Sequence, residues 1–77
     1  MNRQADASER ALGERIQALR DFRGWAQEDF AFRSGLDRAD LADVERGVGN
    51  PTLRTLEAMA RCLGVTVSEL LAGIERL

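Results

Sequence analysis

Short stretches with helically spaced apolar residues, most of them closed by a glycine, run through this chain of 77 residues. Within each stretch the apolar residues recur every three or four positions, which places them on one face of an α-helix. A glycine directly after such a stretch commonly caps the C-terminal end of a helix, and the sequence provides Gly24, Gly35, Gly47 and Gly64 at such places. No segment alternates with period two for long enough to predict a strand. The pattern therefore predicts a compact all-α domain of five short helices.

The capping residues give the expected boundaries of these helices. Residues 1–7 are predicted to form a flexible N-terminal arm, and residues 8–77 a single domain that begins with Ser8 as a helix cap. The second and third helices are expected over residues 27–34 and 38–46, and the fourth between Thr52 and Gly64. A capping box that begins at Thr66 starts a fifth helix, which is expected to run to the end of the chain.

The composition excludes several classes of function. The chain has no histidine and one cysteine, which rules out a zinc finger, a disulfide scaffold and histidine-based catalysis. No apolar stretch approaches the roughly 18 residues that a membrane span needs, and no signal-peptide pattern opens the chain. We therefore expect a cytoplasmic protein that has no membrane contact, needs no cofactor or metal, and is not an enzyme. The net charge of −2 argues against general binding to nucleic acid, which favours basic chains.

The segment from residue 27 to residue 46 nevertheless has the layout of a helix-turn-helix. Two short helices are separated by a tight turn that contains Gly35, and Ala31 is small enough to let them approach closely. A turn of this length projects the second helix outward, where it can enter a DNA major groove about 12 Å wide. If Leu41 and Val44 face the core, helical geometry turns Ala39, Ala42, Asp43 and Arg46 outward.

An ordered set of motifs runs through positions 9–73: Leu12-Gly13-Glu14-Arg15-Ile16, Leu19-Arg20, Arg23-Gly24, Gln27-Glu28-Asp29, Ala31, Ser34-Gly35-Leu36, Glu45-Arg46-Gly47, Asn50-Pro51, Leu56, Leu63-Gly64-Val65 and Ser68-Glu69-Leu70-Leu71. This ordered set resembles the Cro/phage-repressor (XRE) family of DNA-binding domains. The start of the third helix is also similar to that of restriction–modification controller proteins.

This resemblance implies a five-helix fold and a transcriptional regulator, expected to be a repressor, that binds a palindromic DNA operator as a homodimer. Residues 38–46 would be the recognition helix, and a buried ion pair would join Arg20 to Glu45. The resemblance also places a phosphate contact at Gln27, and base contacts at Asp37, Arg38, Ala39 and Asp43.

The residue chemistry supports some of these contacts and leaves alternatives for others. Arg38 can hold a guanine through two hydrogen bonds, Ala39 can touch a thymine methyl group, and Asp43 can accept a hydrogen bond from a cytosine amino group. Asp37 can instead cap the third helix. Further candidates for phosphate contacts, each of which could equally be a solvated surface charge, are Arg23, Arg46 and Arg54.

The C-terminal apolar residues suggest how the chain could pair with a second copy. They form a stripe at helical spacing, part of which a single domain would leave uncovered, so a two-fold contact between the fifth helices is expected. In the alternative the stripe packs on the core of its own chain. The residues of this predicted dimer interface are Leu70, Leu71, Ile74 and Leu77. Phe22 and Phe32 are expected at the edge of the core.

The recognition segment also departs from the family pattern, and this keeps a second function open. It carries acidic residues where polar or basic ones are usual, which weakens attraction to phosphates. The alternative function is that of a protein-interaction or antitoxin-type module that presents an acidic helix 38–46 to a protein partner. The acidic residues are Asp37, Asp40 and Asp43. They could also bind a metal ion, but they lie on a convex helix without a nucleophile or a pocket.

Overall fold

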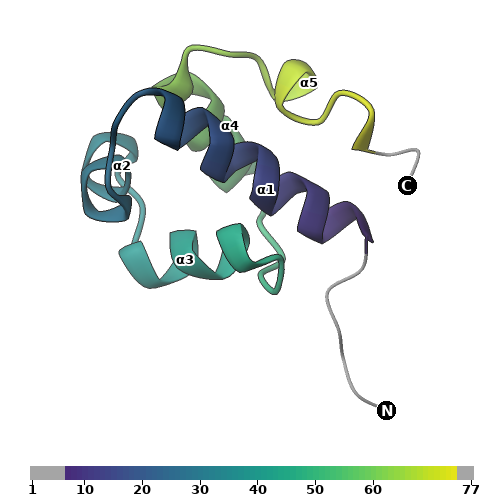
Figure 1. The fold of residues 1–77 in the computed structure, drawn as a ribbon, viewed down its shortest axis with the longest axis horizontal. Coiled ribbons are helices and arrows are strands. Elements are labelled where there is room, and N and C mark those ends of the chain that lie inside the picture. The colour runs from purple at the N-terminus through teal and green to yellow at the C-terminus, as the bar shows by residue number, and fades with distance from the viewer. Residues whose placement is uncertain (1–6, 75–77) are drawn as a thin grey trace.

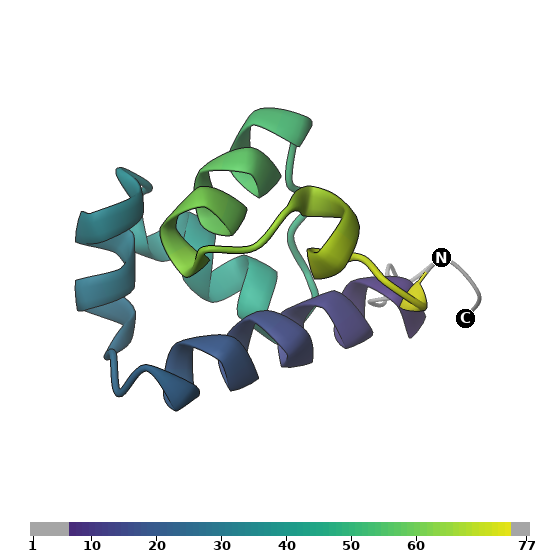
Figure 2. The ribbon, with the colours of Figure 1, turned by 90° about the horizontal axis from the view of Figure 1, so that it is seen from above.

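Five helices account for most of the described part of the chain, residues 7–74, in the computed structural model. They are α1 (Ala7–Phe22), α2 (Gln27–Ser34), α3 (Arg38–Arg46), α4 (Leu53–Leu63) and α5 (Val67–Leu70). α1 crosses the molecule with α3 on one side and α5 on the other (Figure 1). The view from above shows α4 and α5 in front and α3 behind (Figure 2). The all-α prediction is confirmed, since residues 7–74 contain no strand.

Capping groups explain why the middle helices begin and end where the sequence predicts. At the start of α3, Asp37 Oδ1 accepts a hydrogen bond from the backbone N–H of Ala39 at 2.8 Å. At its end, Gly47 has a φ of 79°, a left-handed conformation that glycine adopts without steric cost. Side-chain caps and glycines act in the same way at α4, and a glycine ends α2. The predicted bounds of α2, α3 and α4 are confirmed.

The N-terminal boundary differs slightly from the prediction. Ala7 belongs to α1 rather than to the expected arm, and Ser8 lies within the first turn instead of capping it. The Ser8 hydroxyl donates a hydrogen bond to the carbonyl oxygen of Ile74 at 3.4 Å, which ties α1 to the end of the described chain. The rest of the predicted arm, residues 1–6, lies outside the described residues.

The core is apolar and receives side chains from all five helices. The expected inward residues of α3, Leu41 and Val44, are both buried, as are Phe30 and Ala31 of α2. Full burial of a large apolar side chain stabilises a fold by roughly 1.5 to 3 kcal/mol. The largest fully buried side chains are those of Phe30, Ile16, Leu41, Met59, Leu63 and Leu70.

Among the described residues no helix is both long enough and apolar enough to span a bilayer.

The C-terminal segment departs most from the prediction. The Thr66 capping box is present, but α5 ends at Leu70 and a turn follows, in which Gly73 has a φ of 81°. Leu70 and Ile74 are buried in the core of their own chain, which is the alternative that the sequence left open for this part of the stripe. Leu71 is half-buried, and Leu77 lies outside the described residues.

Arg15 of α1 explains how this short C-terminal segment is held. Its Nη1 donates to the carbonyl oxygens of Glu69 and Leu70, both at 3.2 Å, and its Nη2 donates to that of Ala72 at 3.1 Å. The helix does not continue, so the carbonyls at its end lack the partners that a further helical turn would supply, although that of Glu69 also accepts from the N–H of Ala72 at 3.3 Å. A guanidinium with several donors in fixed geometry supplies part of this missing hydrogen bonding.

Two aromatic side chains are more exposed than expected. Phe22 at the end of α1 is 87 % exposed and Phe32 of α2 is 88 % exposed, so the prediction that they lie at the edge of the core is wrong. The core positions of α2 are filled by Phe30 and Ala31, which leaves Phe32 on the outer side of the helix.

The start of α2 lacks a side-chain cap, which leads to a stability prediction. Ala26 has the extended conformation of an N-cap, and its N–H donates to Asp29 Oδ2 at 3.1 Å, but it offers no side-chain oxygen to the helix. Ala26→Thr should raise the free energy of unfolding by about 1 kcal/mol. The measurement is thermal unfolding followed by circular dichroism. Ala26→Val is the isosteric control, and an equal gain from valine would disprove the capping explanation.

Candidate nucleic-acid interface

The turn between α2 and α3 has the compact form that a helix-turn-helix requires. Gly35 has a φ of 75°, and the N–H of Leu36 donates to the carbonyl oxygen of Ala31 at 3.0 Å. The buried Ala31 side chain fills little space at this point. Three residues, Gly35 to Asp37, therefore suffice to connect the two helices.

A buried ion pair fixes the inner side of α3 to α1. Arg20 Nε donates to Glu45 Oε2 at 2.7 Å, and Arg20 Nη2 donates to Glu45 Oε1 at 3.0 Å. The side chains are only 10 % and 4 % exposed. The hydrogen bonds that Arg20 donates to Glu45, together with the negative charge of that carboxylate, raise the pKa of Arg20 above its usual value, despite the opposing effect of burial. Two parallel bonds hold both planar groups in one orientation, so the structure contains the pair that the family resemblance implies.

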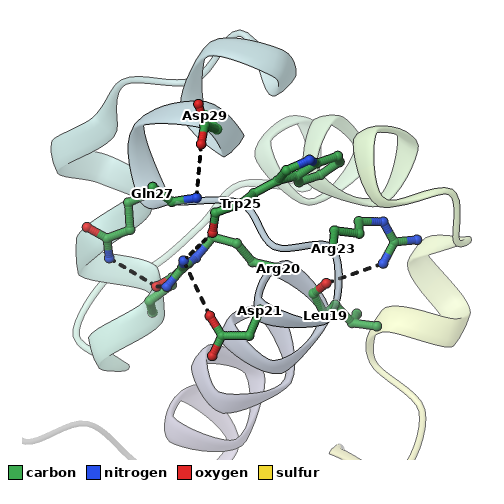
Figure 3. A network of polar contacts seen from close by, with 9 residues as sticks. Leu19, Arg20, Asp21, Arg23, Trp25, Gln27 and Asp29 are labelled. Carbon is green, nitrogen blue, oxygen red and sulfur yellow. Dashed lines mark hydrogen bonds and ion pairs between the residues drawn. The ribbon is translucent and has the colours of Figure 1, made fainter.

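Further hydrogen bonds join α2 and its preceding turn to this pair (Figure 3). The Gln27 side-chain amide donates to Glu45 Oε1 at 3.0 Å, and Arg20 Nη1 donates to the carbonyl oxygen of Trp25 at 2.6 Å. Every buried side-chain nitrogen and oxygen atom among the described residues has a hydrogen-bond partner. The network therefore sets the position of α3 relative to α1 and α2.

Gly13 allows the backbones of α1 and α3 to approach closely. A Cβ atom at this position would lie 2.5 Å from the carbonyl oxygen of Glu45 and 2.6 Å from that of Val44. These are backbone atoms, so rotation of a neighbouring side chain could not relieve the contact. Any larger residue here would push α3 away from α1.

The outer side of α3 forms an open, shallow hollow with the start of α2. α3 lies at the edge of the molecule, at the bottom of Figure 1. The hollow has a volume of about 330 Å³. Its lining includes five of the residues predicted to contact DNA, and the full set is Gln27, Arg38, Ala39, Ala42, Asp43 and Arg46. An adjoining hollow of about 280 Å³ shares Asp43 and extends to the start of α4.

Both arginines of the first hollow are paired with a carboxylate. Arg38 Nη1 lies 3.5 Å from Glu28 Oε2, and these side chains are 62 % and 74 % exposed. Arg46 forms an ion pair with Asp43, one helical turn before it, and both of these side chains are also well exposed. The outer face of α3 therefore presents charges of both signs rather than a uniform acidic surface.

Three of the predicted contact residues do not line this hollow. Asp37 acts as the N-cap of α3, the alternative role that the sequence left open. The Arg23 guanidinium donates to the carbonyl oxygens of Leu19, at 3.3 Å, and Leu63, and Figure 3 shows it on the opposite side of the network from Gln27. Arg54 is exposed in the first turn of α4.

Sequence reasoning missed Glu28 as part of this surface. Its only sequence signal is its place in the first turn of α2, where an acidic residue suits the helix dipole. The contact with Arg38 depends on how α2 and α3 cross, which local patterns do not reveal. Among the described residues no cluster of acidic side chains and cysteine is arranged to hold a metal ion.

Comparison with known protein families gives a match over most of the chain. Residues 16–70 match the family described as helix-turn-helix. The immunity repressor protein of Bacillus phage phi105 is 47 % identical over 57 residues, which cover 74 % of this chain and 40 % of the repressor. The chain spans between 40 % and 57 % of the length of this repressor and of two other curated relatives that it matches, about half on average.

Solved structures include similar proteins of comparable size. The restriction–modification controller protein C.AhdI from Aeromonas hydrophila is 38 % identical with a TM-score of 0.81, and the match covers 84 % of this chain and 98 % of C.AhdI. SinR, described as the master regulator for biofilm formation, was solved in complex with DNA. It is 31 % identical with a TM-score of 0.74, and the match covers 78 % of this chain and 97 % of that structure.

Proposed function

The chain belongs to the XRE-type helix-turn-helix family, and from this premise we propose that it is a sequence-specific DNA-binding transcriptional repressor. It binds a palindromic operator as a homodimer and acts by binding alone, without catalysis. Its relatives come from bacteria and a bacteriophage, so the proposed compartment is the cytoplasm, where bacterial DNA lies. The observation that carries the proposal is the hollow on the outer face of α3, which gathers Gln27, Arg38, Ala39, Asp43 and Arg46.

The chemistry of this face fits the edges of bases in a major groove. Such a groove admits an α-helix and displays a different pattern of donors and acceptors for each base pair. Arg38 would bind guanine, Ala39 would contact a thymine methyl group, and Asp43 would accept a hydrogen bond from cytosine. Asp37 stays at the start of α3 as its cap, with one carboxylate oxygen left for a base.

Phosphate contacts are proposed at the two edges of this face. The backbone N–H groups at the start of α2, beside Gln27, point outward from a helix N-terminus and attract anions. Arg46, at the other end of the hollow, and Arg54, in the first turn of α4, are exposed. Arg23 is left out of the proposal, because its guanidinium donates to carbonyl groups at the ends of α1 and α4.

The homodimer rests on the symmetry of palindromic operators rather than on an apolar stripe. Two copies related by a two-fold axis would place their α3 helices about 34 Å apart, one turn of DNA. Leu70 and Ile74 are buried in their own chain, so they offer little surface to the interface predicted from the sequence. Leu71 is half-buried and keeps part of its surface for such a contact.

The observations favour DNA over the alternative protein partner. That alternative depends on an acidic helix, but Asp37 is used as a cap and Asp43 is neutralised by Arg46. Only Asp40 is left as an exposed acid of this segment without such a role. DNA selection tests the choice: the chain should enrich a palindrome from a random pool of duplexes. Failure to enrich any sequence would contradict the proposal.

Arg38→Ala should weaken binding to the selected operator by roughly 1 to 3 kcal/mol and relax the preference at one base pair of each half-site. The loss follows from the removal of two hydrogen bonds to a guanine. Fluorescence anisotropy with a set of single-base operator variants measures both effects. An equal loss on every sequence would show that Arg38 contacts a phosphate instead. The control is Arg61→Ala, which removes the charge of an exposed arginine of α4.

A further inference from the structure

Two carboxylates form ion pairs with the arginines that the proposed interface would use to contact DNA. Glu28 reaches Arg38 from the neighbouring helix at 3.5 Å, and Asp43 holds Arg46 from within α3. Three of these four residues, Arg38, Asp43 and Arg46, line the hollow on the outer face of α3. Before DNA binds, Arg38 and Arg46 are therefore each already paired with a carboxylate of the protein.

These pairs are weak enough to exchange partners. Exposed ion pairs contribute little free energy, because water and salt screen the charges. A phosphate can therefore take the place of the carboxylate. The released carboxylate then stays beside the DNA backbone, where its charge opposes the gain from the new contact.

This repulsion between the released carboxylate and the phosphates lowers the affinity most for DNA that lacks the operator sequence. Binding without sequence specificity comes almost entirely from neutralised phosphates and released counterions, and both carboxylates reduce that contribution. On an operator, hydrogen bonds to base edges are added, which do not depend on net charge. Asp43 can itself accept one of these bonds from a cytosine amino group.

We propose that Glu28 and Asp43 are specificity-determining residues, which suppress the binding of Arg38 and Arg46 to non-operator DNA. This inference rests on the proposed function as a sequence-specific DNA-binding protein. Specificity is the difference between two affinities, so a group that penalises the wrong sequence raises it even when it adds no contact to the right one. The acidic residues on this face thus contribute to the discrimination between operator and non-operator DNA.

The test compares Glu28→Gln and Asp43→Asn with the wild-type protein on two probes. One probe is the duplex that the wild type enriches from a random pool, and the other is a duplex of scrambled sequence. Affinities are measured by fluorescence anisotropy over a range of salt concentrations. Glu57→Gln, which removes one exposed charge from α4, is the charge-matched control. Thermal unfolding checks that each variant keeps the fold.

Each variant should bind the scrambled duplex roughly 5- to 10-fold more tightly at about 0.1 M salt, and the slope of log affinity against log salt should steepen by about 0.9. The selected duplex should gain less, so the ratio of the two affinities should fall. If the variants behaved like Glu57→Gln while the wild type still preferred the selected duplex, the inference would be overturned but the proposed function would stand. A wild type that binds both duplexes equally would instead overturn the proposed function.

A double variant separates the ion pair from a general effect of charge. When Arg38→Ala is already present, Glu28→Gln should no longer raise the affinity for the scrambled duplex beyond the gain seen with Glu57→Gln. A full gain without Arg38 would show that Glu28 acts through overall charge, and the proposed role of the pair would be wrong.

Discussion

Glu45→Ala is expected to lower the free energy of unfolding by about 3 to 5 kcal/mol, because it leaves the buried Arg20 guanidinium with only the exposed Asp21 carboxylate, 3.5 Å from its Nη1, as a negative partner. It also removes the acceptor of the Gln27 amide. A chain of 77 residues has a total stability of only about 4 to 12 kcal/mol. The variant should therefore unfold at much lower denaturant concentration, as measured by urea titration followed by circular dichroism.

Two comparison variants show whether the loss of the buried charge partner of Arg20 causes this destabilisation. Glu57→Ala removes an exposed glutamate from α4 and should change stability by less than about 0.5 kcal/mol. The double variant Arg20→Met with Glu45→Met replaces both charges by apolar groups and should recover most of the loss. If Glu45→Ala were no more harmful than Glu57→Ala, the ion pair would not be what holds α3 against α1.

Gly13→Ala is expected to destabilise the fold by about 1 to 3 kcal/mol, although alanine normally favours a helix by about 1 kcal/mol over glycine. The added methyl group would collide with the carbonyl oxygens of Val44 and Glu45, at 2.6 and 2.5 Å. α1 and α3 would have to separate, which would also disturb the orientation of α3. Thermal unfolding measures the first effect, and operator affinity the second.

The sign of the change makes Gly13→Ala a sharp test. Ala18→Gly, at an exposed position of the same helix, reports the effect of helix propensity alone and should cost about 1 kcal/mol. If the close approach of α1 and α3 were absent, Gly13→Ala would stabilise the protein by a similar amount. A rise in the unfolding temperature of Gly13→Ala would therefore contradict the observed packing.

The sequence predicted the helices whose ends are set by local chemistry. The start of α3 depends on the carboxylate of Asp37 and its end on Gly47, and both act within a few residues of the boundary. The family resemblance supplied the pairing of Arg20 with Glu45, which lie 25 positions apart. Local patterns and a family pattern together were thus sufficient for the helix-turn-helix.

The C-terminal segment could not be predicted in the same way, because distant residues decide its course. Leu70, Ile74 and Leu77 have helical spacing, but the guanidinium of Arg15 binds the carbonyls at the end of α5, and a left-handed Gly73 follows. The pairing of Arg38 with Glu28 likewise arises from the packing of α2 on α3. Neither contact has a signature in the neighbouring sequence.

The most direct test of the central claim is a nuclear magnetic resonance titration of the ¹⁵N-labelled protein with the duplex that it selects from a random pool. The account predicts that the largest shifts of backbone amide signals occur at Gln27 and along residues 38–46, with smaller ones at the start of α4. Shifts confined to the exposed residues Phe22 and Phe32, or to α5, with α3 unchanged, would contradict it.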